Sequence, residues 1–185
     1  FTAYSEGANK EALRHIVGVQ FRNLATVGGS VFGRFGFSDV LTLLLVMDSY
    51  VELYKGGIVP LADFVNMPYD RDILVRIIVK KTAAHYSYKS VRISKTDFPV
   101  LTCAAALTQE GVQAAVGARP AKAALVKDAE QLATLPMTAE KAQAFAEYAA
   151  GLLPTETNPR GSAAYRTHLI KVLTARCLTE LGGKA

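Results

Sequence analysis

Gln20-Phe-Arg-Asn-Leu-Ala-Thr-Val-Gly-Gly-Ser-Val-Phe-Gly-Arg-Phe-Gly-Phe-Ser-Asp39 is the stretch of this sequence that decides the fold. Its four glycines, Gly28, Gly29, Gly33 and Gly36, allow backbone conformations that are closed to other residues and a close approach to a ligand. A backbone of this kind also exposes N–H groups, which suit a phosphate or the edge of a flavin. The stretch therefore predicts a ligand loop that favours an anionic cofactor.

The residues after this loop predict a buried helix. Ser38 can cap it, because a serine oxygen accepts a hydrogen bond from the first turn, where Asp39 lies. The following run, Val40-Leu-Thr-Leu-Leu-Leu-Val-Met47, is almost wholly apolar, which is typical of a helix surrounded by other elements. The ligand loop is thus expected to be anchored to a core helix.

The amino-acid composition and the net charge limit which classes of protein are possible. Of the 185 residues, 50% are hydrophobic and 20% are charged, which indicates a globular chain with a sizeable core. The net charge is +5, but no basic run exceeds Lys80-Lys81 and no aromatic residues alternate with basic ones, so we expect no nucleic-acid partner. The charge suits an acidic cofactor or partner, and a solvated surface is the alternative.

Neither a membrane span nor an iron–sulfur cluster is expected. The longest apolar run, Leu41 to Met47, is far shorter than the roughly 20 residues that cross a bilayer. Two cysteines, Cys103 and Cys177, cannot supply the four ligands of a cluster. A reduced pair of core cysteines, with no visible secretory signal, indicates a cytoplasmic protein.

Hydrophobic patterning predicts two groups of strands, with helices at both ends of the chain. A composition shift at Thr82-Ala83-Ala84 predicts a domain boundary there, giving domains 1–82 and 83–185. The third strand is expected to be buried on both faces because it is dense in β-branched residues. The predicted strands are 50–54, 58–61, 72–79, 85–93, 99–108, 111–118 and 123–126, and the predicted helices are 5–17, 128–135, 138–150 and one through Ile170, Leu173, Cys177 and Leu181.

Two motifs far apart in the chain resemble one family, the FAD-binding subunits or domains of molybdenum hydroxylases, which include xanthine dehydrogenase and carbon monoxide dehydrogenase. The first motif is Arg22-Asn-Leu-Ala-Thr-Val-Gly-Gly-Ser30 followed by Ser38-Asp39, and the second is Arg160-Gly-Ser-Ala-Ala-Tyr-Arg166. The resemblance implies an α+β fold: the second half of a PCMH-type (vanillyl-alcohol-oxidase-like) FAD-binding domain in 1–82. A domain like the C-terminal domain of the CO dehydrogenase flavoprotein, a three-stranded antiparallel sheet plus helices, would follow in 83–185.

The resemblance also implies which residues contact the flavin. Leu74 matches a family leucine that touches the flavin ring, and ordinary core packing is the alternative role for it. Lys89 matches a family lysine that lies near the flavin. Without the resemblance, Lys89 would be interpreted as a solvent-facing strand residue. Two positions depart from the family pattern: Ser30 replaces an asparagine, and Phe35-Gly36 replaces Ser-Pro. The implied cofactor-binding residues are Ala25, Thr26, Gly28, Gly29, Ser30, Phe32, Gly33, Ser38, Asp39, Leu74 and Lys89, with no catalytic side chain and no metal ligand.

The function that the resemblance implies is electron transfer through FAD, from the iron–sulfur clusters of a 2Fe-2S small subunit to an external acceptor. The substrate would be oxidised at a molybdenum-cofactor large subunit. The family pattern begins with a further subdomain that grips the FAD pyrophosphate, so we expect this chain alone to fold, to retain no FAD and to leave a surface on which a second copy could pair. A non-catalytic scaffold subunit that keeps the fold without flavin is the alternative.

Overall fold

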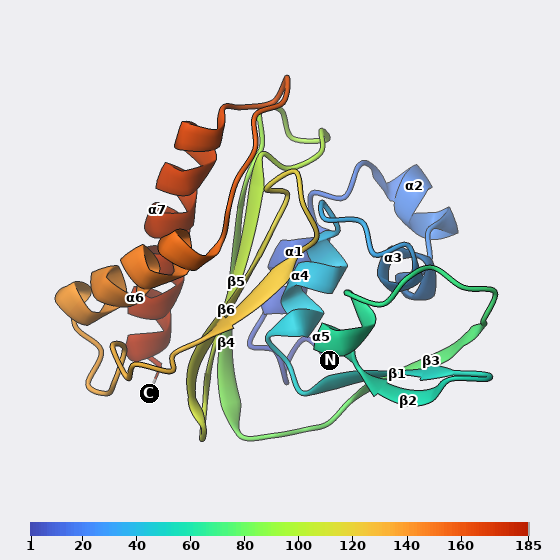
Figure 1. Ribbon diagram of the computed structural model, residues 1–185, viewed down its shortest axis with the longest axis horizontal. Helices are drawn as coiled ribbons and strands as arrows, with labels where there is room; N and C mark the ends of the chain where they lie inside the picture. Colours follow the sequence, from blue (N-terminus) through green and yellow to red (C-terminus); the bar gives the residue numbers. More distant parts are fainter. Residues whose placement is uncertain (185) are drawn as a thin grey trace.

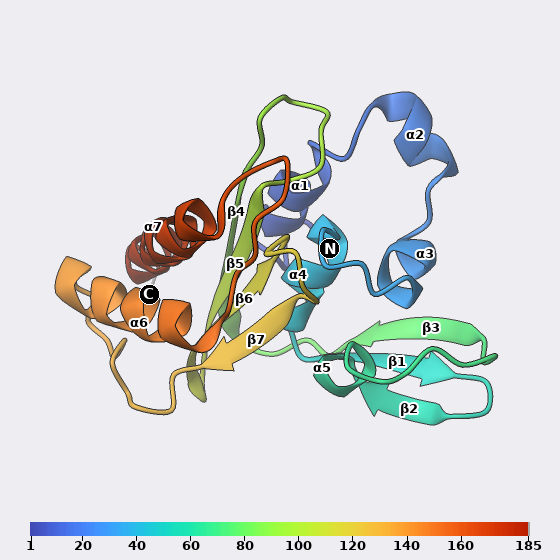
Figure 2. The same ribbon diagram turned by 45° about the horizontal axis from the view of Figure 1, so that its top comes forward.

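The computed structural model describes residues 1–184 and arranges them as two antiparallel sheets with helices between and outside them (Figure 1 and Figure 2). A four-stranded sheet runs through the middle of the molecule, with two long helices on one face and the core helix on the other. The elements are α1 (Ala8–Leu13), α2 (Val19–Leu24), α3 (Val27–Phe32), α4 (Asp39–Leu45), β1 (Ser49–Leu53), β2 (Gly57–Pro60), α5 (Leu61–Phe64), β3 (Leu74–Val79), β4 (Ala84–Val91), β5 (Leu101–Thr108), β6 (Gly111–Gly117), β7 (Ala124–Lys127), α6 (Ala139–Leu152) and α7 (Ala163–Gly182).

The central sheet has the order β4-β5-β6-β7, and every neighbouring pair is antiparallel. Its last three strands are the three that the sequence predicts for the second sheet, and β4 adds a fourth strand beside β5. Because successive side chains of a strand point to opposite faces, Ala104 packs into the cluster around α4 while Cys103 and Ala105 pack into the cluster around α6 and α7. The alanines of β5 let helices lie close on both faces.

The core helix α4 confirms the sequence expectation. All seven of its residues are buried, and the Ser38 hydroxyl accepts a hydrogen bond from the Leu41 N–H at 3.2 Å. Thr42 joins the helix to the central sheet, since its hydroxyl lies 3.0 Å from that of Thr102 on β5. The helix is therefore a fixed support for the segment that enters it.

The smaller sheet has the order β2-β1-β3, and it corrects one expectation. The predicted strands 50–54 and 58–61 are present and pair as a hairpin, with Val51 of β1 opposite Val59 of β2. The prediction that β3 is buried on both faces is wrong, because β3 lies at the edge of the sheet and its residue Val75 is 48% exposed. A β-branched run indicates a strand, but its place within the sheet depends on tertiary contacts.

Both long C-terminal helices agree with prediction, whereas two shorter helices do not. Thr138 caps α6 by accepting a hydrogen bond from Lys141 N at 3.3 Å. The predicted helix at 128–135 is wrong, since the Asp128 carboxylate instead accepts from the N–H groups of Leu132 and Ala133 in a turn. The predicted helix 5–17 shortens to α1, because turns occupy the residues on either side of it.

Cys103 and Cys177 are both buried and free. Within residues 1–184, no helix combines the length and the apolar character that crossing a membrane requires.

Candidate functional site

The glycine-rich stretch forms two short helices, α2 and α3, instead of the open loop that was predicted. Thr26 caps α3, because its hydroxyl accepts a hydrogen bond from the Gly29 N–H at 3.0 Å. Within the described residues, the glycines with positive φ are Gly7, Gly57 and Gly111, so the glycines of this stretch do not use left-handed conformations.

These glycines instead serve close packing. A Cβ added at Gly33 would lie 2.5 Å from a ring carbon of Phe35, and one added at Gly36 would collide with the Ala121 carbonyl. The chain reverses between α3 and α4 with Arg34 at a φ of 47°. The Arg34 guanidinium donates to the Met67 carbonyl at 2.9 Å and stacks on the Phe64 ring at 4.4 Å, which holds the reversal in place.

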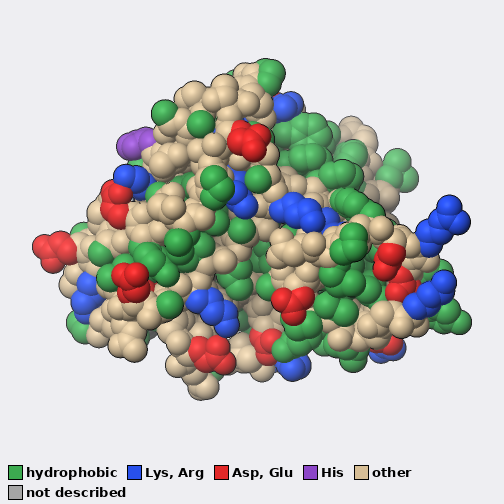
Figure 3. Space-filling view, viewed as in Figure 1, with side chains coloured by type: hydrophobic (Ala, Val, Ile, Leu, Met, Phe, Trp, Pro, Cys, Tyr) green, Lys and Arg blue, Asp and Glu red, His purple; other side chains and the backbone are tan. Residues whose placement is uncertain are grey.

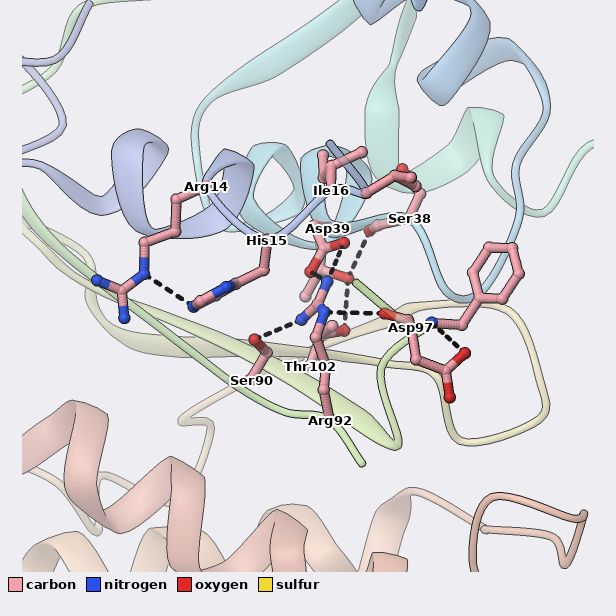
Figure 4. A network of polar contacts seen from close by, with 12 residues as sticks. Arg14, His15, Ile16, Ser38, Asp39, Ser90, Arg92, Asp97 and Thr102 are labelled. Carbon is pink, nitrogen blue, oxygen red and sulfur yellow. Dashed lines mark hydrogen bonds and ion pairs between the residues drawn. The ribbon is translucent and has the colours of Figure 1, made fainter. Parts of the chain in front are cut away.

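Asp39, at the start of α4, is the centre of a buried polar network (Figure 4). The Nη2 atom of Arg92 lies 2.7 Å from Asp39 Oδ1 and 2.6 Å from Oδ2, and both side chains are less than 8% exposed. The Tyr88 hydroxyl donates to the same Oδ1 at 2.5 Å. Burial, followed by the neighbouring Asp39 charge, raises the pKa of Tyr88 well above its usual value, so the phenol stays a donor.

The Arg92 guanidinium donates hydrogen bonds to three residues. Besides Asp39, its Nη1 donates to the Ser90 hydroxyl at 2.6 Å and its Nε donates to the Asp97 carbonyl at 3.2 Å. The Asp97 carboxylate pairs in turn with Arg160 at 3.1 Å, and the Arg160 guanidinium lies 5.2 Å from the centre of the Phe98 ring. The network thus extends from α4 to the segment between β4 and β5 and to the loop before α7.

A cavity of about 540 Å³ opens beside this network. It lies between the segment that contains α2 and α3 on one side and the segment after β4 on the other. Its lining residues are His15, Ile16, Val17, Phe21, Ala25, Thr26, Gly29, Ser30, Phe35, Phe37, Ser38, Asp39, Arg92, Thr96, Asp97, Phe98, Pro99 and Arg160.

Aromatic rings form one wall of the cavity. Phe35 and Phe37 are stacked with ring centres 5.2 Å apart and an interplanar angle of 7°, and Phe98 lies 4.5 Å from Phe37 at a tilt. Hydrophobic side chains also gather on the surface over α2 and α3, where Leu24 is 87% exposed (Figure 3). Flat apolar surfaces of this kind accept a planar ring by stacking.

The structure brings six of the predicted site residues to the cavity and leaves the others outside its lining. Gly28, Gly33, Phe32 and Leu74 lie on or against α3, and Phe32 and Leu74 pack against the core. Lys89 is not brought to the cavity, because it points to the opposite face of β4 from Tyr88 and pairs with Glu180 of α7 at 2.7 Å. The six residues that line the cavity are Ala25, Thr26, Gly29, Ser30, Ser38 and Asp39.

The sequence analysis did not assign to the site four further residues that line the cavity: His15, Arg92, Phe98 and Arg160. Arg92 is 53 residues from Asp39, so no local spacing could have joined them. The exposed Phe35 and Phe37 gave a weak signal, because two phenylalanines flanking Gly36 in a polar turn have no role in a core.

The residues present fit a flavin ring. The cavity combines a stacking wall with a buried polar end, where Arg92 and His15 carry N–H groups. One of them, the Nδ1 atom of His15, is buried with no hydrogen-bond partner in residues 1–184. A planar heterocycle with carbonyl and ring-nitrogen acceptors along one edge complements such a site.

Fold and site together define a class: a two-part flavoprotein in which a small sheet with a capped glycine segment precedes a sheet-and-helix domain. Residues 2–81 match the FAD binding domain in molybdopterin dehydrogenase, and residues 86–181 match the CO dehydrogenase flavoprotein C-terminal domain. The chain therefore belongs to the FAD-binding flavoprotein family of molybdenum hydroxylases, and FAD is the cofactor of the intact protein. The resemblance and the fold class inferred from sequence are confirmed.

Two curated relatives match most of the chain. The chain is 30% identical over 169 residues to the uncharacterized protein YgfM of Escherichia coli K12 and to that of E. coli O157:H7, which covers 91% of this chain and 62% of each relative. It thus spans less than two thirds of these relatives' length.

Two solved structures share the fold over the full chain. Carbon monoxide dehydrogenase from Hydrogenophaga pseudoflava superposes with a TM-score of 0.87 at 22% identity, over 100% of this chain and 70% of that one. Quinoline 2-oxidoreductase from Pseudomonas putida 86 superposes with a TM-score of 0.79 at 21% identity, over 100% and 72%.

Proposed function

We propose that the intact protein is the FAD-binding electron-transfer subunit of a molybdenum hydroxylase. In this proposal, electrons from a substrate oxidised at a molybdenum-cofactor large subunit pass through a 2Fe-2S small subunit to FAD and then to an external acceptor. A xanthine dehydrogenase-like complex in the cytoplasm is the form that we predict. The observation that carries the proposal is the 540 Å³ cavity, in which residues of the family's glycine motif face an aromatic wall.

The chain's own residues would hold and shield the cofactor. Thr26, fixed as the cap of α3, and Ser38, fixed as the cap of α4, lie at one side of the cavity with their backbones held in place. Phe35 and Phe37 would cover a ring face and exclude water. Bound FAD would supply the electron-transfer chemistry, and the protein would position it and tune its electrostatics.

We retain two further predictions. The division into domains 1–82 and 83–185 stays a prediction, as does the set of eleven cofactor-binding residues. The two core clusters lie on opposite faces of the central sheet, so an α1–α4 layer and an α6–α7 layer can be tested separately by mutation.

The test is the flavin content and partner set of the intact protein, purified from cells that express the neighbouring genes. We expect a flavin absorption spectrum and co-purification of a molybdenum-containing and a 2Fe-2S chain. Ala25→Trp should fill the cavity and remove the flavin, because Ala25 is an exposed lining residue in extended backbone. Ala164→Trp on the exposed side of α7 is the matched control and should keep it.

A colourless intact protein that still binds the two partner chains would refute the electron-transfer role. It would support the scaffold alternative instead. An unchanged flavin content in Ala25→Trp would show that the flavin lies elsewhere.

A further inference from the structure

The carboxylate of Asp39 has little capacity left for a ligand. Its Oδ1 accepts from Tyr88 and Arg92, and its Oδ2 accepts from Arg92. The side chain is only 6% exposed, in contact with the N-terminal turn of its own helix. A residue so fully engaged is suited to positioning its partner and poorly suited to contacting a cofactor.

The guanidinium of Arg92, in contrast, has an N–H of Nη1 to spare. A guanidinium carries five N–H bonds in a fixed fork. Nε donates to the Asp97 carbonyl, Nη2 lies within hydrogen-bond distance of both Asp39 oxygens, and Nη1 donates one N–H to Ser90. The second N–H of Nη1 has no partner among the described residues, and Arg92 lines the cavity while its side chain is 7% exposed.

His15 offers a second unpartnered N–H at the same end of the cavity. Arg14 Nε, which can only donate, lies 2.8 Å from His15 Nε2, so Nε2 is the acceptor and the neutral ring carries its proton on Nδ1. Figure 4 shows the ring between Arg14 and the Arg92–Asp39 pair. Burial, and then the charges of Arg14 and Arg92, lower the pKa of His15, which keeps the ring neutral at neutral pH.

The polar end of the cavity therefore presents unpartnered hydrogen-bond donors, while the charge of Arg92 is paired with that of Asp39. The Ser38 hydroxyl, a possible acceptor, already accepts from Leu41 N and donates to the Ser30 carbonyl at 3.0 Å. The Thr26 hydroxyl likewise accepts from Gly29. A ligand that offers acceptors, such as carbonyl oxygens and an unprotonated ring nitrogen, is complementary to this end, whereas a ligand edge made of donors is not.

We propose that Arg92 and His15 contact the acceptor edge of the planar heterocycle bound in this cavity, and that Asp39 positions Arg92 without touching the ligand. This inference rests on the proposed function, in which the heterocycle is the flavin ring. It reverses the role that the family resemblance implies for Asp39. A hydrogen-bond donor fixed beside the acceptor edge also favours the electron-rich reduced form of the ring, so Arg92 would raise its midpoint potential.

The test is a double-mutant cycle on the intact protein, with the dissociation constant of FAD measured by titration calorimetry. Arg92→Gln should weaken binding roughly tenfold or more, which corresponds to a lost hydrogen bond from a charged donor. If Asp39 acts only through Arg92, the double variant Asp39→Asn/Arg92→Gln should bind no more weakly than Arg92→Gln alone. Additive losses would show that Asp39 contacts the ligand and would overturn the inference.

A second variant, His15→Phe, and a second measurement, the midpoint potential of bound FAD, extend the test. His15→Phe removes the Nδ1 donor while keeping a ring, and the only hydrogen bond it loses within residues 1–184 is the one from Arg14. It should weaken FAD binding by about threefold to tenfold with an unchanged melting temperature. The midpoint potential of bound FAD should fall in Arg92→Gln and stay unchanged in Lys171→Gln, because Lys171 of α7 pairs with Glu147 of α6 and does not line the cavity.

The outcomes separate this inference from the proposed function. FAD bound with wild-type affinity and potential in both Arg92→Gln and His15→Phe overturns the inference alone. A wild-type intact protein that binds no FAD overturns the proposed function and the inference with it.

Discussion

The Tyr88 hydroxyl donates a short hydrogen bond of 2.5 Å to the Asp39 carboxylate and so helps to join the central sheet to the core helix. Tyr88 belongs to β4 of the central sheet, and Asp39 opens the core helix α4. Both residues are at most 5% exposed, so water cannot replace the bond if it is lost. The start of α4, and with it the floor of the cavity, is thereby fixed to the sheet.

Removing this bond should destabilise the protein. Tyr88→Phe keeps the ring but takes one donor from a buried carboxylate, and we expect a loss of about 1–3 kcal/mol in the free energy of unfolding. Urea unfolding measures the loss. Tyr54→Phe is the control, because Tyr54 is 74% exposed and should change the free energy of unfolding by less than about 0.5 kcal/mol. Equal stabilities of the two variants would contradict the role given to Tyr88.

The second prediction concerns Arg166, a fully buried arginine that has no carboxylate partner among the residues the structure describes. Its guanidinium donates to the carbonyls of Val100 at 3.0 Å, Glu156 at 2.7 Å and Gly161 at 2.5 Å, and to Asn158 Oδ1 at 2.5 Å. A lysine carries the charge but cannot reproduce the planar fork. Arg166→Lys should therefore lower the free energy of unfolding by about 2–3 kcal/mol.

Amide hydrogen exchange should show the loss of stability in the loop that Arg166 holds. The loop at 156–161 contains Arg160, so its amides should exchange faster in Arg166→Lys and the cavity rim should loosen. Arg176→Lys on the exposed face of α7 serves as the control. Wild-type exchange in the loop of Arg166→Lys would show that the fork is not what holds it.

The third prediction is a pH dependence at the junction of β4 and α7. Partial burial opposes the ionisation of Glu180, but hydrogen bonds from Lys89 and Ser87 outweigh it and lower the pKa of Glu180. Between the lowered value and the ordinary value, the unfolded chain binds more protons than the folded one, so stability rises with pH in that window. The contribution is complete above roughly pH 5 and is lost as the pH falls through the lowered value.

Glu180→Gln should thus be less stable than the wild type at neutral pH and equal to it in acid. Because the side chain is 41% exposed, the difference should stay below about 1 kcal/mol. Thermal melts at a series of pH values measure it. Glu110→Gln, at a side chain that is 88% exposed, should show no such crossover, and a constant difference for Glu180→Gln at all pH values would refute the linkage.

Local signals in the sequence were enough for the core helix and the hairpin of β5 and β6. Ser38 followed by an apolar run specifies a capped buried helix, and a Gln109-Glu110-Gly111 turn between two apolar runs specifies a hairpin, because these features act over a few residues. The helical form of the glycine stretch could not be predicted in this way. Its glycines disfavour a helix, and the Thr26 cap together with packing against β3 outweighs that preference.

For the same reason, only one side of the cavity could be predicted from the sequence. The glycine motif marked the side that contains Thr26 and Ser38, since those residues are contiguous. Arg92 reaches the cavity from a segment far away in the sequence, and the roles of Arg92 and His15 depend on which hydrogen bonds remain unmade after folding. Unmade hydrogen bonds of this kind can be identified only from the folded structure.

The last prediction concerns Gly36, between the two stacked phenylalanines of the cavity wall. Its carbonyl accepts a hydrogen bond from the Ala118 N–H at 2.6 Å, and a Cβ at this position would collide with the carbonyl of Ala121. Backbone cannot move aside as cheaply as a side chain, so Gly36→Ala should lower the free energy of unfolding by about 1–3 kcal/mol. It should also displace Phe35 and Phe37 and weaken FAD binding in the intact protein.

Gly151→Ala is the matched control for this change. Gly151 lies in the last turns of α6, with no atom within 4 Å of an added Cβ, so alanine should leave stability unchanged or raise it by up to about 1 kcal/mol. Both variants exchange one hydrogen for one methyl group, and the difference between their unfolding midpoints therefore isolates the contact with Ala121. If Gly36→Ala is as stable as Gly151→Ala and binds FAD normally, the close approach between the α3–α4 segment and the β6–β7 turn does not position the aromatic wall.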